Sequence, residues 1–251
     1  MEIIFLCFFS SFAGFIDAVV GGGGLIQLPA LFIFVPHVPL AAIFGTNKLA
    51  SIAGTSTAAI QYTKHIQINW TATLPTAIAA FIFSFLGARV VSSINPELLR
   101  PAISILLIAV AIYTFVKKDF GSLHAPKLAA IAQKWIGISV GSAIGFYDGF
   151  FGPGTGSFLT FAFIGIFGFD FLNAAIAARV VNFATNLSAM LYFAFTDNIL
   201  YQYALPMAAC NMIGAFLGAK LAVSKGSQFV RGLFLVVVSA LIIKFAYDTL
   251  Q

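Results

Sequence analysis

The sequence predicts an all-α integral membrane protein built from two copies of one unit. Of its 251 residues, 61% are hydrophobic and 8% are charged, whereas soluble domains carry about 25% charged residues. The apolar residues fall into ten stretches, separated by short polar or glycine-rich segments. The second half of the chain also repeats the first at a constant offset of 145 − 14 = 131 residues. The charges are too few to cover a water-soluble surface, so we expect a lipid bilayer to surround most of the chain.

The repeat includes charged and turn residues as well as apolar ones. The run Gly14–Asp17 (GFID) returns as Gly145–Asp148 (GFYD), and Phe85–Arg89 (FLGAR) returns as Phe216–Lys220 (FLGAK). Apolar composition alone does not produce such matches. At the same offset Lys48 corresponds to Arg179, Pro75 to Pro206 and Arg100 to Arg231.

Most of the apolar stretches have the length of a transmembrane helix. Eight are near the roughly 20 residues that a spanning helix needs. Two others, at 24–36 and 155–168, are too short and follow glycine-rich breaks. We therefore predict about eight transmembrane helices plus two short or re-entrant helical segments. The eight long stretches cover residues 3–20, 40–62, 70–92, 101–116, 134–151, 171–195, 202–223 and 229–247.

A polar linker separates the two predicted repeats. Residues 1–117 form the first transmembrane repeat, 118–133 the linker and 134–251 the second repeat. Lys and Arg concentrate in cytoplasmic loops. Because lysines flank and occupy this linker, we expect it to be cytoplasmic in a multi-pass membrane protein.

The relative orientation of the repeats depends on how often each crosses the membrane. With four crossings per repeat, the Lys and Arg residues near the membrane surfaces divide 6 to 5 between the two sides, with the linker on the side of six. With five crossings the second repeat is inverted and the division becomes 8 to 3. The positive-inside rule therefore favours inverted repeats. A segment of about 12 residues covers only about 18 Å of helix, so parallel repeats remain an alternative.

Two glycine clusters interrupt the first apolar stretch of each repeat. Each cluster ends one helix and starts another, and the N–H groups and dipole of a new helix N-terminus attract anions. Irregular backbone at membrane depth survives where it lines a wet cavity or is buried in protein, so close helix packing is the alternative interpretation. The predicted anion-binding positions are Gly22, Gly23 and Gly24 in the first cluster and Gly154, Thr155 and Gly156 in the second.

Lys48 and Arg179 lie at equivalent positions well inside apolar stretches. A cation at this depth costs a few kcal/mol on insertion scales and normally faces the bundle interior or an aqueous path. Two such cations facing one cavity would suit a small anion. The alternatives are that each pairs with a buried carboxylate or extends to the membrane surface.

Carboxylates that could form such pairs are present in both repeats. Asp17 and Asp148 are equivalent, and each precedes a glycine cluster by a few residues. Apolar surroundings favour the protonated carboxyl group and a nearby cation favours the carboxylate. Both a structural ion pair and a proton-coupling role are therefore compatible with the sequence. Polar neighbours that we expect in the cavity wall are Thr46, Asn47, Asn182 and Asn186.

Three segments together resemble a known family. Gly14–Pro29 (GFIDAVVGGGGLIQLP), Gly45–Leu49 (GTNKL) and Phe216–Lys220 resemble the TauE/SafE family of sulfite and organosulfur-anion exporters, over essentially the whole chain. The resemblance implies a bacterial-type inner-membrane carrier for sulfite, sulfoacetate or related sulfonates. The second glycine cluster and Arg179 depart from the pattern of the first repeat, which leaves the choice of anion open.

We thus expect a transporter that works by alternating access between the repeats, with a small anion and the lipid bilayer as its partners. An anion channel and a non-transport accessory membrane protein are the alternatives. We do not expect an enzyme, a cofactor or a metal, because the three histidines show no ligand spacing with Cys or Glu. Nucleic acid is not expected, because no basic stripe is interleaved with aromatic residues. No oligomeric state follows from the sequence.

Overall fold

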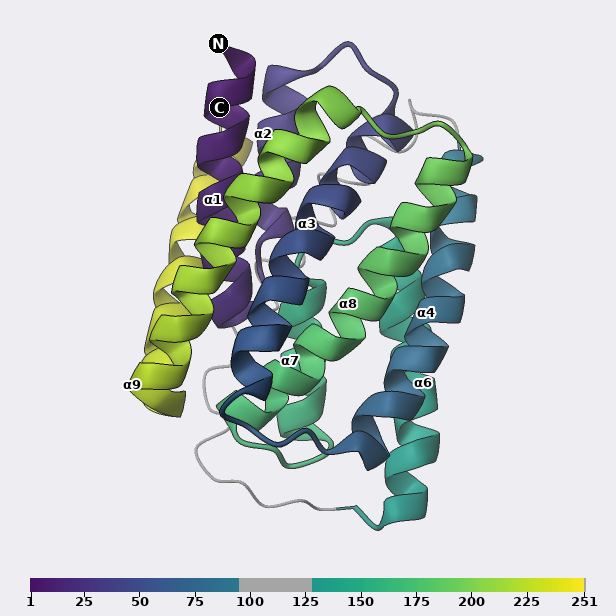
Figure 1. Cartoon of the computed structure of the whole chain (residues 1–251), viewed down its shortest axis with the longest axis vertical. Helices are drawn as coiled ribbons and strands as arrows, with labels where there is room; N and C mark the ends of the chain where they lie inside the picture. Colours follow the sequence, from purple (N-terminus) through teal and green to yellow (C-terminus); the bar gives the residue numbers. More distant parts are fainter. Residues whose placement is uncertain (95–127, 251) are drawn as a thin grey trace.

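The computed structural model describes residues 1–94 and 128–250, with side chains up to Lys225. These residues form helices and turns without strands (Figure 1), as predicted. The predicted span at 101–116 lies outside the described residues, and the side chains of the span at 229–247 are not described. The helices are α1 (Glu2–Val20), α2 (Gly24–Phe34), α3 (Leu40–Thr63), α4 (Trp70–Ser92), α6 (Ala130–Phe150), α7 (Thr155–Gly165), α8 (Phe171–Phe195) and α9 (Tyr201–Leu250).

Several of these helices are suited to cross a membrane. Helices α1, α4, α8 and the part of α9 up to Lys225 are long and apolar enough to do so. Helices α3 and α6 have 24 and 21 residues. Helices α2 and α7 have 11 residues each, too few for a full crossing. The two short segments therefore form separate helices after the glycine clusters, as the sequence indicated.

Helix boundaries in the two halves coincide at the offset seen in the sequence. Helices α2 and α7 begin 155 − 24 = 131 residues apart and end 165 − 34 = 131 residues apart. Helices α3 and α8 begin at 40 and 171, and α4 and α9 begin at 70 and 201. The N-caps of equivalent helices differ: the Asn69 side chain caps α4 whereas Leu200 precedes α9, and the Asp170 side chain caps α8 whereas Pro39 precedes α3. The same helices thus form in both halves from different local sequences.

Equivalent helices of the two halves run in opposite directions. Helix α1 begins at the top of Figure 1 and α6 begins at the bottom. Helices α3 and α8 cross antiparallel, and at their crossing the Asn186 amide lies 3.4 Å from the Thr55 hydroxyl, two residues that are 131 positions apart. Further along, Tyr62 at the end of α3 packs against Arg179 near the start of α8. A contact between equivalent residues of antiparallel helices is the one expected on a two-fold axis.

Each half also contributes a helix to the other half. Helix α1 packs along α9, and its equivalent α6 packs along α4. Small residues at these contacts bring the backbones close, as in other membrane proteins. On α6 the register places Gly141 against Thr76, Gly145 against Ala80 and Gly149 against Ser84.

The two glycine clusters meet at the centre of this arrangement. Gly21 ends α1 in the left-handed conformation, with φ of 87°. A Cβ atom on Gly21 would overlap the backbone at Gly156, and one on Gly156 would overlap Gly21 in turn. Gly24 likewise faces Pro153. The sequence at both clusters therefore allows two backbone breaks to cross in direct contact, and this crossing forms one wall of the site.

Candidate functional site

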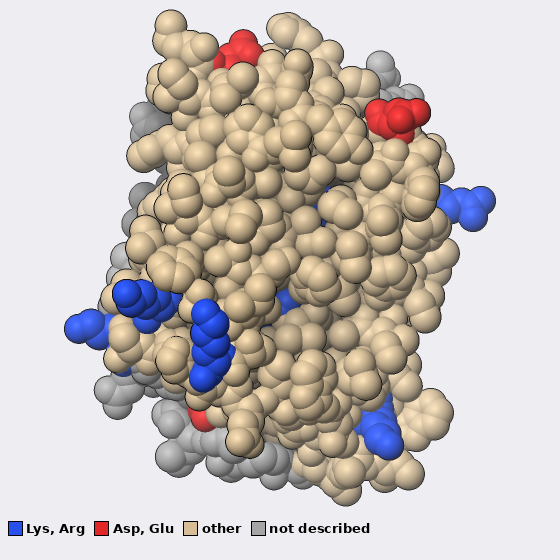
Figure 2. All heavy atoms as spheres, viewed as in Figure 1, with Lys and Arg blue, Asp and Glu red and all other residues tan. Residues whose placement is uncertain are grey.

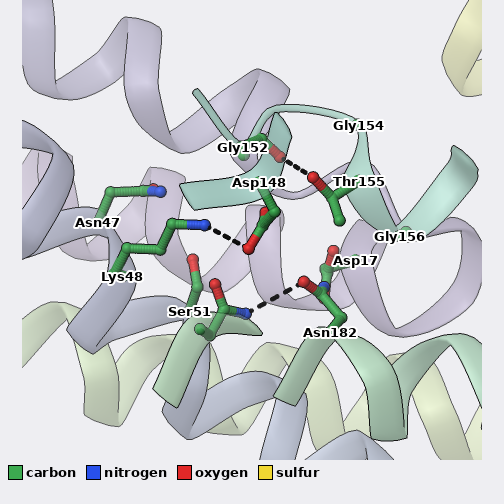
Figure 3. A pocket seen from close by; sticks show the side chains of 13 residues that line it. Asp17, Asn47, Lys48, Ser51, Asp148, Gly152, Gly154, Thr155, Gly156 and Asn182 are labelled. Carbon is green, nitrogen blue, oxygen red and sulfur yellow. Dashed lines mark hydrogen bonds and ion pairs between the residues drawn. The ribbon is translucent and has the colours of Figure 1, made fainter. Parts of the chain in front are cut away.

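A small polar cavity lies where the two glycine clusters meet α3 and α8 (Figure 3). Its volume is about 20 Å³, enough for about one water molecule. Both halves of the chain contribute to its wall. The lining residues are Asp17, Gly21, Gly24, Asn47, Lys48, Ser51, Asp148, Gly152, Gly154, Thr155, Gly156, Asn182 and Asn186.

A buried ion pair between the two halves forms one side of the cavity. The Lys48 Nζ atom of α3 lies 2.6 Å from Asp148 Oδ2 of α6, and the two side chains are 3% and 2% exposed. This is the carboxylate pairing that the sequence left as an alternative for Lys48. Removing one partner of such a pair leaves an uncompensated buried charge and costs about 3–5 kcal/mol.

The second glycine cluster fits closely around this ion pair. Gly152 has φ of 98°, and a Cβ atom there would lie 3.1 Å from Lys48 Nζ and 3.4 Å from Asp148 Oδ1. A side chain at Gly152 would therefore be strained by its backbone conformation and would press on the charged atoms. Glycine at this position lets the chain turn beside the ammonium group.

Asp17, the equivalent of Asp148, has a different partner. Its Oδ1 accepts a hydrogen bond of 3.2 Å from the N–H of Gly23 at the start of α2. A carboxylate at a helix N-terminus is stabilised by the helix dipole. Asp17 also interacts electrostatically with Arg179, Asp148 and Lys48, but within the described residues it forms no salt bridge. The two equivalent carboxylates thus differ in their contacts while lining the same cavity.

Arg179 lies beside the cavity rather than in its wall. The side chain is 1% exposed, and its Nη2 atom donates to the carbonyl oxygens of Asp17 and Ala18 at the end of α1. Its guanidinium also lies 6.0 Å from the centre of the Tyr62 ring. The cation therefore offsets the negative C-terminal end of α1. Each buried cation contacts the aspartate-bearing helix of the other half, Lys48 through a carboxylate and Arg179 through carbonyl groups.

The N-termini of α2 and α7 approach the cavity from opposite halves. Gly24 opens α2, and Gly154, Thr155 and Gly156 open α7, and all four line the cavity. Part of the donor capacity of α7 is already used, because the Ser157 N–H bonds Gly21 O at 3.0 Å. Two helix N-termini beside a lysine give this small volume an environment that favours negative charge.

Amide and hydroxyl groups complete the wall between α3 and α8. Asn186 donates to the Asn182 Oδ1 atom at 3.4 Å. Asn47 is 3% exposed, and its Oδ1 atom has no hydrogen-bond partner among the described residues. In Figure 3 the Asn47 amide lies beside the Lys48 side chain. Buried polar groups are normally paired, so Asn47 retains hydrogen-bonding capacity at the cavity.

The structure brings together ten of the fourteen predicted site residues. The other four are not among the lining residues, and three of them have structural contacts: Arg179 bonds the end of α1, Thr46 accepts a hydrogen bond from Leu200 N before α9, and the Gly23 N–H is bonded to Asp17. The sequence prediction omitted three lining residues, Gly21, Ser51 and Gly152. Ser51 lies one helical turn after Asn47 and is equivalent to Asn182. The ten are Asp17, Gly24, Asn47, Lys48, Asp148, Gly154, Thr155, Gly156, Asn182 and Asn186; the four are Gly22, Gly23, Thr46 and Arg179.

Comparison with known proteins gives one consistent result. The model of the family described as "Sulfite exporter TauE/SafE" matches residues 6–245. A Sinorhizobium protein named "Probable membrane transporter protein ORF9" is 32% identical over 98% of this chain and 93% of its own length. A "Probable membrane transporter protein" of Haemophilus influenzae is 33% identical over 94% and 91%, and YfcA of Escherichia coli K12, with the same designation, is 30% identical over 97% and 89%. No solved structure matches the chain significantly.

Proposed function

The chain belongs to the TauE/SafE family of membrane transporters, and we propose that it carries a small anion by alternating access at the cavity between its two halves. The proposed substrates are sulfite, sulfoacetate and related organosulfur anions. The observation that carries the proposal is the buried ammonium group of Lys48, which shares one cavity with the N-termini of α2 and α7.

The proposed anion contacts come from both halves. Lys48 supplies a charged donor, the glycine clusters supply backbone N–H groups, and Asn47, Asn182 and Asn186 supply amides. Charge-assisted hydrogen bonds of this kind are about twice as strong as neutral ones. Arg179 lies outside the cavity and stabilises the end of α1 by donating to the Ala18 carbonyl oxygen. A cavity of about 20 Å³ has no room for an oxyanion, so we assign the described conformation to a closed state.

We also propose that the halves are inverted repeats in a bacterial inner membrane. Arg89 and Lys220 are equivalent and exposed. Arg89 is in the last turn of α4, which runs upward in Figure 1, whereas Lys220 lies well along α9, which begins at the top and runs downward. Figure 2 shows that Lys and Arg gather toward the end where α6 begins. Three more exposed lysines lie on this side: Lys64 after α3, Lys134 near the start of α6 and Lys225 at the end of the described side chains of α9, and these parts of the helices lie toward the bottom of Figure 1. By the positive-inside rule this end is cytoplasmic, and we propose the same side of the membrane for the linker because α6 begins here.

Counterflow in proteoliposomes tests the proposed transport. Vesicles containing the purified protein are loaded with unlabelled sulfite or sulfoacetate and diluted into the radiolabelled anion. A carrier exchanges external label for internal anion and accumulates label transiently above the external concentration. With the membrane potential held at zero by valinomycin and equal potassium on both sides, a channel gives no such overshoot, and an accessory protein gives no uptake above protein-free vesicles. Absence of overshoot with both anions would contradict the proposed function.

A further inference from the structure

The ionisable groups at the site balance in the described conformation. Two basic side chains, Lys48 and Arg179, and two acidic ones, Asp17 and Asp148, belong to the same region, so their formal charges sum to +2 − 2 = 0. Of these, Lys48, Asp148 and Arg179 are each 1–2% exposed. An uncompensated charge in such surroundings is strongly unfavourable. Any anion that enters therefore needs a compensating positive charge.

The proposed anion and the Asp148 carboxylate need the same ammonium group. Lys48 Nζ is held at 2.6 Å by Asp148 Oδ2, and the adjoining cavity of about 20 Å³ has no room for an anion beside an intact ion pair. Lys48 becomes available only when Asp148 withdraws. A carboxylate that loses its cation in a buried site holds a proton more strongly.

We propose that the anion and Asp148 compete for Lys48, so that the protein co-transports one proton with each negative charge and the whole cycle is electroneutral. This inference rests on the proposed function. As the anion binds, the Lys48–Asp148 ion pair breaks and an O–H bond forms on Asp148, with the proton taken from water on the side of entry. On the other side the anion leaves, the proton returns to water and the ion pair re-forms. A divalent anion brings a second charge, for which Asp17 is the second proton acceptor.

Among the described residues, few ionisable side chains surround Asp148. Facing it are Lys48 from α3 and Asp17 from α1, and Asp17 in turn interacts with Arg179 from α8. On its own helix Tyr147 is occupied by a hydrogen bond of 2.6 Å from its hydroxyl to Pro153 O. Helix α7 carries no ionisable side chain, and the single one on α4, Arg89, is exposed.

The experiment compares anion uptake driven by a pH gradient with anion uptake driven by a membrane potential. Proteoliposomes that show counterflow with sulfoacetate or sulfite are given either a gradient of one pH unit, acid outside, or a potassium diffusion potential set with valinomycin. Each coupled proton is expected to concentrate the anion about 10-fold in the pH gradient, and the potential is expected to change uptake little. The inference would be overturned if anion uptake increased with an inside-positive potential and did not change with the pH gradient. Counterflow would still be present in that case, so the proposed function would stand.

A substitution identifies the proton acceptor. Asp148→Asn has nearly the same shape but cannot take up a proton, so the anion crosses with one charge uncompensated. Uptake by this variant is then expected to rise with an inside-positive potential. The measure is the ratio of its uptake with the potential to its uptake without it, so its absolute rate does not matter. Asp197→Asn is the control, because it makes the same chemical change at an exposed turn with φ of 53°, where Asn is tolerated. Anion uptake by this control is expected not to change with the potential. If a folded Asp148→Asn protein also showed uptake that did not change with the potential, Asp148 would be excluded as the proton acceptor. The wild-type experiment tests electroneutrality even if this variant does not fold.

Discussion

At the scale of single residues, equivalent positions in the two halves have taken different roles. Lys48 ends in a compact ammonium group that meets the Asp148 carboxylate at the cavity. Arg179 ends in a planar fork that reaches the carbonyl groups of Asp17 and Ala18 behind it. An ammonium group is readily exchanged between partners, whereas the guanidinium suits several fixed acceptors. The exchangeable cation therefore lies at the cavity and the fixed one beside it.

At the scale of elements, the breaks between α1 and α2 and between α6 and α7 hold the site together. Each break brings a helix N-terminus to the cavity, and close contact at Gly21 and Gly156 fixes the distance between the two. The end of α1 is held further by Ser157, whose hydroxyl donates to Val20 O at 3.0 Å. The site thus depends on glycine at particular positions of the clusters, not on glycine throughout.

Substitution of neighbouring glycines tests this dependence. Gly21→Ala would place a Cβ atom against the Gly156 backbone and force alanine to φ of 87°, a strain of about 1 kcal/mol or more before the overlap is counted. At Gly22 a Cβ atom would be no closer than 3.8 Å to any neighbour. We expect Gly21→Ala to lower the melting temperature in detergent and abolish counterflow, and Gly22→Ala to match wild type in both. Equal behaviour of the two variants would contradict the role given to the crossing.

At the scale of the whole molecule, the two halves exchange helices, and we propose that they are inverted repeats. Helix α1 packs on α9 and α6 on α4, so neither half packs independently of the other. The antiparallel contact of α3 with α8 lies at the centre. Substrate sites at the interface of inverted repeats are common in transporters, where one half moves against the other.

Labelling from each side of the membrane tests the inversion. In a background without Cys7 and Cys210, we expect Arg89→Cys to react with a membrane-impermeant maleimide only from outside the cell. Lys220→Cys, its equivalent 131 residues later, should react only after the inner face is opened. Parallel repeats would place both cysteines on the same side.

The sequence predicted much of this account because its signals are local or repeated. Glycine clusters, intramembrane charges and apolar lengths predicted the short helices, the partners available to Lys48 and ten of the lining residues. The contacts of Arg179 and Thr46 could not be predicted, because both bind backbone groups, and a backbone group has no sequence signature. Ser51 could have been found from its four-residue spacing to Asn47, which places both on one face of α3. The packing of α1 on α9 depends on how the halves interlock, which no single segment specifies.

The most direct test of anion binding at Lys48 is counterflow by the double variant Lys48→Gln with Asp148→Asn. Replacing both partners of the ion pair leaves no unpaired buried charge, so this variant is expected to fold, as size-exclusion chromatography in detergent would show. We predict that its apparent affinity for sulfite or sulfoacetate falls about 10-fold or more, because a charge-assisted contact worth about 1.5–3 kcal/mol is lost. The same pair of changes at exposed Lys134 and Asp197 controls for altered net charge. Wild-type affinity in the folded Lys48–Asp148 double variant would contradict the assignment of the site.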